Sequence, residues 1–263
     1  MPPLTDTDAR TIADALYQAL NTRTPIAPLT ATRPTLSLTE AYLIQSHFMQ
    51  RRIDDGETLR GYKLGITSKP MQDLLGVDHP DFGPIFASAV LESGTEVQSD
   101  AFIAPRAEAE IAVILQSDLT GPNCTALDAR RASAGIAASI EVVDSRIADW
   151  KIGLADTIAD LASSGVLILS STTVPIDGFD PRLVGMAFSR GGEVVATGAG
   201  AAALGDPFAA VAWLANTLGS LGVTLRAGQI IMTGALHAMV PMAPGDVFTA
   251  EFDRLGSVTL RVA

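Results

Sequence analysis

The run PRAEAEIAV, from Pro105 to Val113, places Glu108 and Glu110 inside an otherwise apolar stretch. The stretch predicts a β-strand, in which residues i and i+2 project to the same face. The two glutamates would then share one face with Ala112, and the opposite face would be apolar throughout. Since the acidic face also becomes apolar within two residues, neither face is a solvent surface. A fold that contains this strand must accommodate two negative charges away from water.

Two carboxylates on one face of such a strand repel each other and lose hydration, which raises their free energy unless a positive charge lies between them. A divalent cation is the simplest such charge, because hard cations take oxygen ligands. An isolated E-x-E pattern more often marks a strand end where both side chains reach water. The metal interpretation therefore needs further ligands from elsewhere in the chain.

Glu141 is the third candidate ligand, because it also lies in a β-like apolar run, SIEVVDSR. Three carboxylates around Mg²⁺ or Mn²⁺ leave coordination positions open for water and for a chelating substrate. Asp144 follows closely, but on a strand it would point away from Glu141. We therefore expect Asp144 to be structural and paired with Arg146.

Lys63 lies within a glycine-bounded strand, GYKLGIT, and Asp81 lies in the loop VDHPDFGPIF. A lysine in a strand is usually solvated or at a sheet edge, and an aspartate before Phe-Gly usually forms a turn. The functional alternative for Lys63 is a positive charge offered to an anionic substrate or an enolate. The functional alternative for Asp81 is a general acid or base.

The segment TGALH ends a predicted apolar strand and supplies Thr233, Gly234, Leu236 and His237. A glycine there would let backbone N–H groups approach a ligand, and the histidine would face the same site. The alternatives are an ordinary strand-to-turn glycine and a structural histidine. We take these four residues, together with Ser163, as the predicted substrate contacts.

Residues 1–56 are predicted to form a helical N-terminal region, with a cap at Thr5 or Asp6 and a capping box from Ser37 to Glu40. Residues 57–263 contain many short predicted strands separated by Gly, Pro and Asp, with a few helices. The predicted fold class is therefore α+β: a mostly-β body, curled and barrel-like, with a small helical N-terminal part.

Composition excludes several classes of protein. The 18 Lys and Arg against 29 Asp and Glu give a net charge of −11, which argues against nucleic acid and anionic membranes as partners. The single cysteine, Cys124, excludes an intrachain disulfide and a cysteine metal site. The start of the sequence shows no secretory signal, and no apolar run reaches the length of a membrane span. We therefore expect a cytoplasmic protein, and the hydrophobic content of 48% predicts a homo-oligomer.

Six segments carry a resemblance to a known family: GYKLGITSK, GVDHPDFGPIF, PRAEAEIAVIL, EVVDSRIADWKI, GAGAAALGDP with WLANTL, and TGALHAMVPMAPGD. In this order, from about Gly61 to the C-terminus, they resemble the 2-oxopent-4-enoate hydratase family of the fumarylacetoacetate hydrolase superfamily, which includes 4-oxalocrotonate decarboxylases. The resemblance implies the β-rich fold of that superfamily. One position departs from the pattern, because Leu161 stands where relatives commonly have Asn.

The resemblance also implies roles for single residues. Glu108, Glu110 and Glu141 match the family's metal-binding acids, for Mg²⁺ or Mn²⁺. Lys63 and Asp81 match residues that act in proton transfer. The segments DSRIADWKI and TGAL are more similar to those of hydratases than to those of decarboxylases.

The resulting hypothesis is a metal-dependent hydratase that adds water to a 2-hydroxy-2,4-dienoate, in the catabolism of aromatic compounds. Its partners would be a small anionic 2-oxo or 2-hydroxy acid and, among proteins, the downstream aldolase or a paired decarboxylase. One alternative is a 4-oxalocrotonate decarboxylase that uses the same metal chemistry. The other is an inactive scaffold subunit of a catabolic enzyme complex.

Overall fold

The computed structural model describes residues 3–263 and begins with three helices. They are α1 (Asp6–Thr22), α2 (Leu29–Thr32) and α3 (Leu38–Asp54). Thr5 caps α1 and Ser37 caps α3, each through a capping box in which an acidic side chain bonds back to the cap. The helices expected here are present, and Thr5 rather than Asp6 is the first cap.

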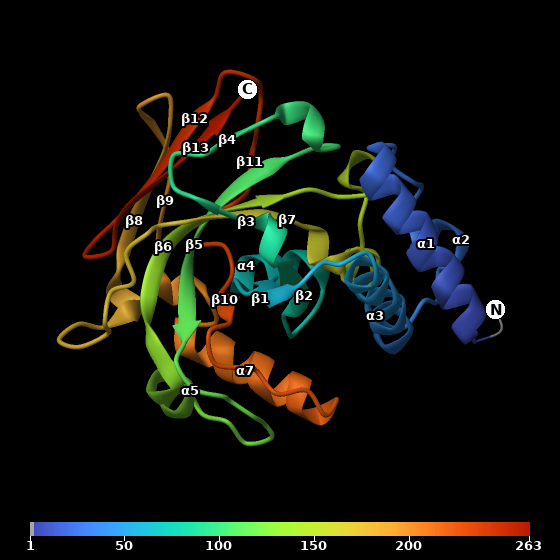
Figure 1. Cartoon of the computed structure of the whole chain (residues 1–263), viewed down its shortest axis with the longest axis horizontal. Helices are drawn as coiled ribbons and strands as arrows, with labels where there is room; N and C mark the ends of the chain where they lie inside the picture. The colour runs from blue at the N-terminus through green and yellow to red at the C-terminus, as the bar shows by residue number, and fades with distance from the viewer. Residues whose placement is uncertain (1–2) are drawn as a thin grey trace.

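Two open mixed sheets form the body of the molecule (Figure 1). In order across the first sheet, the strands are β2 (Asp81–Phe86), β1 (Leu59–Gly65), β10 (Ile230–Met232), β5 (Arg106–Leu115), β6 (Ser133–Val143), β7 (Ser164–Leu169) and β3 (Val90–Glu92), and β11 (Val240–Pro241) also pairs with β5. The second sheet contains β4 (Glu96–Val97), β13 (Gly256–Val262), β12 (Val247–Phe252), β8 (Gly185–Arg190) and β9 (Glu193–Ala199). The α+β class is confirmed. The sheets are open rather than barrel-like, because each ends in two edge strands among the described residues.

Strand β5 lies inside the first sheet and presents two different faces. It is antiparallel to both of its neighbours, β6 and β10. One face, which includes Ile111 and Val113, joins the main core together with the second sheet. The other face carries Glu108 and Glu110 and joins a smaller apolar cluster at Ala112. The alternation inferred from the sequence is therefore confirmed.

Four further α-helices of the described chain accompany the sheets: α4 (Lys69–Leu75), α5 (Ala126–Ala132), α6 (Leu154–Ala159) and α7 (Pro207–Ser220). Asp206 caps α7, which packs beside α5 against the main core. In Figure 1, the blue helices α1–α3 gather at one end of the molecule, and β8, β9, β12 and β13 lie at the other. The N-terminal helices bury a separate apolar cluster that includes residues of α6 and Leu161. Within residues 3–263, no helix is both long enough and apolar enough to cross a bilayer.

Candidate metal centre and its cavity

Three carboxylates converge on one side of strands β5 and β6. Glu108 lies directly across from Glu141 in the ladder, and Glu110 is two residues further along β5. One carboxylate oxygen from each lies within 4.8 Å of the other two. Glu110 is 0% exposed and Glu141 is 3% exposed, and each has a buried oxygen without a hydrogen-bond partner among the described residues. The three acids that the sequence predicts as metal ligands are therefore brought together by one pair of adjacent strands.

The closeness of these acids changes their ionisation. Burial, and next the charge of Glu141, raises the pKa of Glu108 to about 7. The same two causes raise the pKa of Glu110 well above its usual range. Burial also raises the pKa of Glu141, although Lys63 opposes the rise. The three groups therefore resist being ionised together unless a cation compensates them.

Lys63 supplies one positive charge to this cluster. Its ammonium group lies 3.3 Å from Glu141 and donates a hydrogen bond of 3.0 Å to the carbonyl oxygen of Ala162. Burial alone would lower the pKa of Lys63, but the carboxylates, with Glu141 first, outweigh burial and raise the pKa. Three carboxylates and one ammonium leave two negative charges in excess. This excess and the oxygen donors fit a hard divalent cation.

Asp81 lies at the start of β2 and is 1% exposed. It pairs in register with Gly65, where a Cβ would lie 2.2 Å from Oδ1 of Asp81, so the glycine makes room for the carboxyl group. Burial raises the pKa of Asp81, whereas Lys63 opposes the rise. The same Oδ1 has no hydrogen-bond partner in residues 3–263. A buried carboxyl group with raised proton affinity is suited to the predicted acid–base role.

The loop between β10 and β11 completes the surroundings of Glu110. Gly234 has a φ of 107° and donates its N–H to Oε2 of Glu110 over 2.8 Å. A Cβ at this position would lie 1.9 Å from the hydroxyl oxygen of Thr67, so the fold requires glycine here. Thr233 is buried, and its hydroxyl donates to the carbonyl oxygen of Ile111. Gly234 therefore holds a candidate metal ligand and Thr233 holds the loop to β5, while their contact with a substrate stays a prediction.

His237 lies in the loop between β10 and β11 and forms a hydrogen bond with strand β5. The N–H of Ala109 donates to Nε2 of His237 over 2.9 Å. Nδ1 lies 2.7 Å from the carbonyl oxygen of Ala238, so Nδ1 carries the proton and the ring is neutral. The ring also packs on Phe188, with 4.5 Å between the centroids. His237 therefore orients the strand between the two glutamates, and its predicted contact with a substrate would be made through the ring.

Replacing His237 with phenylalanine is expected to lower stability and to remove part of its pH dependence. Burial lowers the pKa of His237 from the usual 6.5, so the unfolded chain binds a proton more readily than the folded one. The free energy of unfolding of the native protein should therefore fall as the pH drops through this range. The variant keeps a ring but leaves the buried N–H of Ala109 unpaired, at a cost of about 1–3 kcal/mol.

Denaturant unfolding across acid and neutral pH measures both effects of H237F. His79→Gln is the matched control, because His79 lies outside this loop and its Nδ1 bonds to the carbonyl oxygen of the neighbouring Pro80. An H237F variant with native stability and native pH dependence would contradict the anchoring role of His237.

A cavity of about 1120 Å³ opens beside the acids. Six of the predicted site residues line it: Lys63, Asp81, Glu108, Ser163, Leu236 and His237. Glu110 is buried and does not line the cavity, but one of its carboxylate oxygens lies within 4.8 Å of one from Glu108, which does. Apolar side chains form much of the remaining wall, among them Ile66, Met71, Ile152, Leu204 and Met239. The candidate metal centre therefore lies at one side of a space large enough for a small organic acid.

The lining residues that the sequence did not mark as part of the site include Arg106, Trp150 and Thr157. Arg106 lies two residues before Glu108 on the same strand, so the alternation rule could have found it. Its guanidinium lies 4.5 Å from the centroid of the Trp150 ring. Thr157 bonds to the hydroxyl of Ser163 over 3.3 Å, a contact that depends on the fold of α6 and has no local signal.

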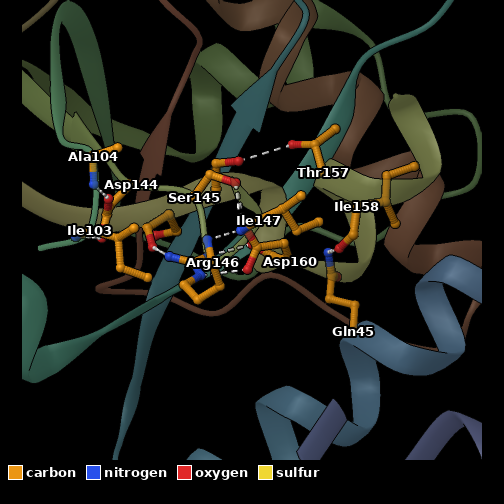
Figure 2. A network of polar contacts seen from close by, with 12 residues as sticks. Gln45, Ile103, Ala104, Asp144, Ser145, Arg146, Ile147, Thr157, Ile158 and Asp160 are labelled. Carbon is orange, nitrogen blue, oxygen red and sulfur yellow. Dashed lines mark hydrogen bonds and ion pairs between the residues drawn. The ribbon is translucent and has the colours of Figure 1, made fainter. Parts of the chain in front are cut away.

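The prediction that Asp144 pairs with Arg146 is wrong (Figure 2). Asp144 accepts hydrogen bonds from the backbone N–H groups of Ile103 and Ala104, whereas Arg146 forms an ion pair with Asp160. Strand β6 ends before Asp144, so the residues beyond it do not follow the alternation of a strand. Asp144 is nonetheless structural, as expected.

The fold and the site define the class of this protein, an α+β enzyme with buried acids suited to a divalent metal. The family model described as fumarylacetoacetate (FAA) hydrolase C-terminal matches residues 60–263. The chain therefore belongs to the fumarylacetoacetate hydrolase family, as the resemblance of its six segments implied.

Relatives and solved structures agree with this placement. The chain is 46% identical over 246 residues to a 2-keto-4-pentenoate hydratase of Paraburkholderia xenovorans (strain LB400). The alignment covers 94% of this chain and 91% of that protein. It is 42% identical over 248 residues to a 2-hydroxyhexa-2,4-dienoate hydratase of Comamonas testosteroni, with 94% of both chains covered. It is also similar to the structure of a 4-oxalocrotonate decarboxylase from Pseudomonas putida G7 complexed with magnesium and adipate, with a TM-score of 0.96, 34% identity and 100% coverage of both chains.

Proposed function

We propose that this protein is a divalent-metal-dependent hydratase that adds water to a 2-hydroxy-2,4-dienoate and forms a 4-hydroxy-2-oxo acid. The observation that carries the proposal is the convergence of Glu108, Glu110 and Glu141 with Lys63 and Asp81 beside one cavity. Relatives named hydratases, at 42% and 46% identity, support this reaction class. Mg²⁺ and Mn²⁺ are the ions that the oxygen ligands suit.

A bound divalent ion would supply a Lewis acid that polarises the 2-oxo group of the substrate. Lys63 would offer its positive charge to the enolate oxygen that develops at C2 when water adds, because Glu141 and Ala162 fix its ammonium group. Asp81 would deliver a proton to C5 of the dienol while the 2-hydroxyl group loses its own, which gives an α,β-unsaturated 2-oxo acid. Water would then add its hydroxyl at C4 and a proton at C3, and Asp81 and Lys63 would relay these protons.

Metal removal is expected to stop this reaction. The assay follows the dienol absorbance of 2-hydroxypenta-2,4-dienoate with purified protein and Mg²⁺, in the presence and absence of EDTA. Absorbance should be lost with Mg²⁺ and retained with EDTA, because the chelator removes the polarising charge. An excess of Mg²⁺ or Mn²⁺ over the chelator should restore turnover. A loss of absorbance that EDTA leaves unchanged would contradict the metal-dependent mechanism.

The two alternatives predict different results in the same experiment. A 4-oxalocrotonate decarboxylase would release CO₂ from its dicarboxylate substrate and would leave the dienoate unhydrated. It needs a cation for the second carboxylate, and among the described lining residues Lys69 and Arg106 are the cations besides Lys63. An inactive scaffold would show no EDTA-sensitive loss of absorbance. The intact set of three acids with Lys63 and Asp81 favours an active enzyme.

We also expect the protein to form a homo-oligomer. The hydrophobic content of 48% supports this expectation, because an apolar chain can bury part of its surface between subunits. The molar mass in solution, measured by light scattering, tests this expectation. A monomeric mass would contradict it.

A further inference from the structure

Three consecutive residues after α6 adopt a backbone conformation that is unfavourable for them. Leu161, Ala162 and Ser163 have φ values of 55°, 52° and 55°, and none of them is glycine. In this left-handed region the Cβ atom lies too close to the following carbonyl oxygen, so each residue costs conformational free energy. We call residues 161–163 the left-handed turn. A turn of this kind persists only where the surrounding contacts impose it.

The left-handed turn contributes two groups to the candidate site. The carbonyl oxygen of Ala162 accepts the hydrogen bond of 3.0 Å from Lys63. Ser163 lines the cavity, with its hydroxyl 3.3 Å from that of Thr157. Because φ and ψ set the direction of each peptide group, the unusual conformation decides where the Ala162 carbonyl points.

The packing around the left-handed turn leaves little freedom. A Cβ on Gly83 would lie 2.1 Å from the carbonyl oxygen of Leu161. Gly83 is also the register partner of Lys63 across β1 and β2. The side chain of Leu161 is 1% exposed and lies in the apolar cluster of the N-terminal helices. The residue that replaces the family's usual Asn therefore anchors the turn to the helices.

A buried ion pair holds both ends of the left-handed turn (Figure 2). Nε of Arg146 donates to Oδ1 of Asp160 over 2.5 Å, and Nη2 donates to the carbonyl oxygen of the same aspartate. Nη1 donates to the carbonyl oxygen of Ser164 over 2.7 Å. Ser145 adds a hydroxyl bond of 3.2 Å to Oδ2 of Asp160. With Arg146 1% exposed and Asp160 0% exposed, the guanidinium bridges the residues before and after the turn.

We propose that Arg146 and Asp160 are positioning residues for Lys63: their ion pair holds the left-handed turn, and the turn fixes the ammonium group through the carbonyl oxygen of Ala162. The ammonium group donates one of its three N–H bonds to Ala162 and lies 3.3 Å from Glu141, so these two contacts set its position. The kinetic consequence of this inference rests on the proposed function. The claim that the ion pair fixes the position of the Lys63 ammonium group does not depend on any activity.

Asp160→Asn tests the proposal, because asparagine keeps the shape of the side chain and removes its charge. We expect kcat to fall by about 10- to 100-fold, since a misplacement of about 1 Å has effects of this size. KM for the dienoate should change by less than about twofold, because the loss is in the reacting geometry and not in ground-state binding. The affinity for Mn²⁺, measured by titration calorimetry, should also be retained. A crystal structure of D160N should show Nζ of Lys63 beyond hydrogen-bond distance of the Ala162 carbonyl.

Asp246→Asn is the matched control. Asp246 pairs with Arg190 and accepts a backbone N–H, as Asp160 does, but its contacts lie at the second sheet. This variant should keep the native kcat. Because breaking a buried ion pair can prevent folding, Ser145→Ala provides a milder change, which removes one bond to Asp160 without unpairing a charge. It should lower kcat by a smaller factor at an unchanged KM.

Two results would overturn the proposal. The first is a structure of D160N, or of S145A if D160N does not fold, that retains the native contact between Lys63 and Ala162. The second is a fall in kcat accompanied by an equal loss of Mn²⁺ affinity, which would show general damage to the site. If the native protein hydrates no dienoate, the proposed function fails, while the variant structures still decide whether the ion pair positions Lys63.

Discussion

Replacing Glu108 with glutamine is expected to abolish metal-dependent turnover while it stabilises the metal-free protein. Glutamine keeps the shape of the side chain but removes one of three acids whose oxygens lie within 4.8 Å of one another. Turnover with Mg²⁺ should fall at least about 100-fold, since even residues behind the ligands change metal affinity by about 10- to 100-fold. Burial of its charge and repulsion from Glu141 raise the pKa of Glu108 to about 7. A neutral glutamine removes both costs. The thermal midpoint of the metal-free variant should therefore rise.

Thermal unfolding in EDTA and in Mg²⁺ separates the two effects. Mg²⁺ should stabilise the native protein, because an ion that binds only the folded state adds to the free energy of unfolding, and it should stabilise E108Q much less. Glu251→Gln, at an exposed position of β12, is the matched control. Near-native turnover of E108Q would refute the role of Glu108 as a metal ligand.

Replacing Lys63 with methionine should have the opposite effect on the metal-free protein. Lys63 is 4% exposed, and its ammonium group lies 3.3 Å from Glu141. Removal of one partner from a buried ion pair leaves the other charge uncompensated and costs about 3–5 kcal/mol. Mg²⁺ should restore part of this stability, because its charge replaces that of the ammonium group. Turnover should fall by about 10²- to 10⁴-fold, as for the loss of a group that transfers protons.

Denaturant unfolding with and without Mg²⁺, together with the dienol assay, measures these effects of K63M. Lys151→Met is the control, because Lys151 belongs to an ion pair with Asp149 in which its side chain is 73% exposed, and exposed pairs contribute little to stability. If K63M in EDTA unfolded at the same denaturant concentration as the native protein, the charge balance inferred for the site would be wrong.

The acidic face of β5 could be predicted from local rules alone. The two-residue alternation of a strand places Glu108 and Glu110 together whatever the rest of the fold does. That Glu141 lies opposite Glu108 depends on strand register, which alternation does not specify. For Glu141, and for the roles of Lys63 and Asp81, the resemblance to a family supplied what local patterns could not.

Other features arise only from tertiary contacts. Arg146 pairs with Asp160 and not with Asp144, because the chain leaves the strand before these residues. The left-handed turn contains no glycine, so nothing in its sequence marks the positive φ values. His237 bonds to the backbone through both of its ring nitrogens, an anchoring role that no local pattern indicates, and its contact with a substrate stays a prediction. The sequence also could not predict that the sheets are open, because short strands with Gly and Pro turns occur in open and closed sheets alike.

In the proposed enzyme, the loop between β10 and β11 would link substrate selection to metal retention. It contributes Leu236 and His237 to the cavity wall, and the same short segment bonds to Glu110 and to the backbone of Ala109. A substitution that reshapes this wall for a bulkier acid would therefore disturb the strand that carries Glu108 and Glu110, two of the candidate metal ligands. Divergence of substrate range should proceed instead through wall segments that carry none of the three acids, such as the one that presents residues 66–71. Substrate range and metal binding would then evolve on separate parts of the chain. Only a change in the loop between β10 and β11 would be expected to affect both.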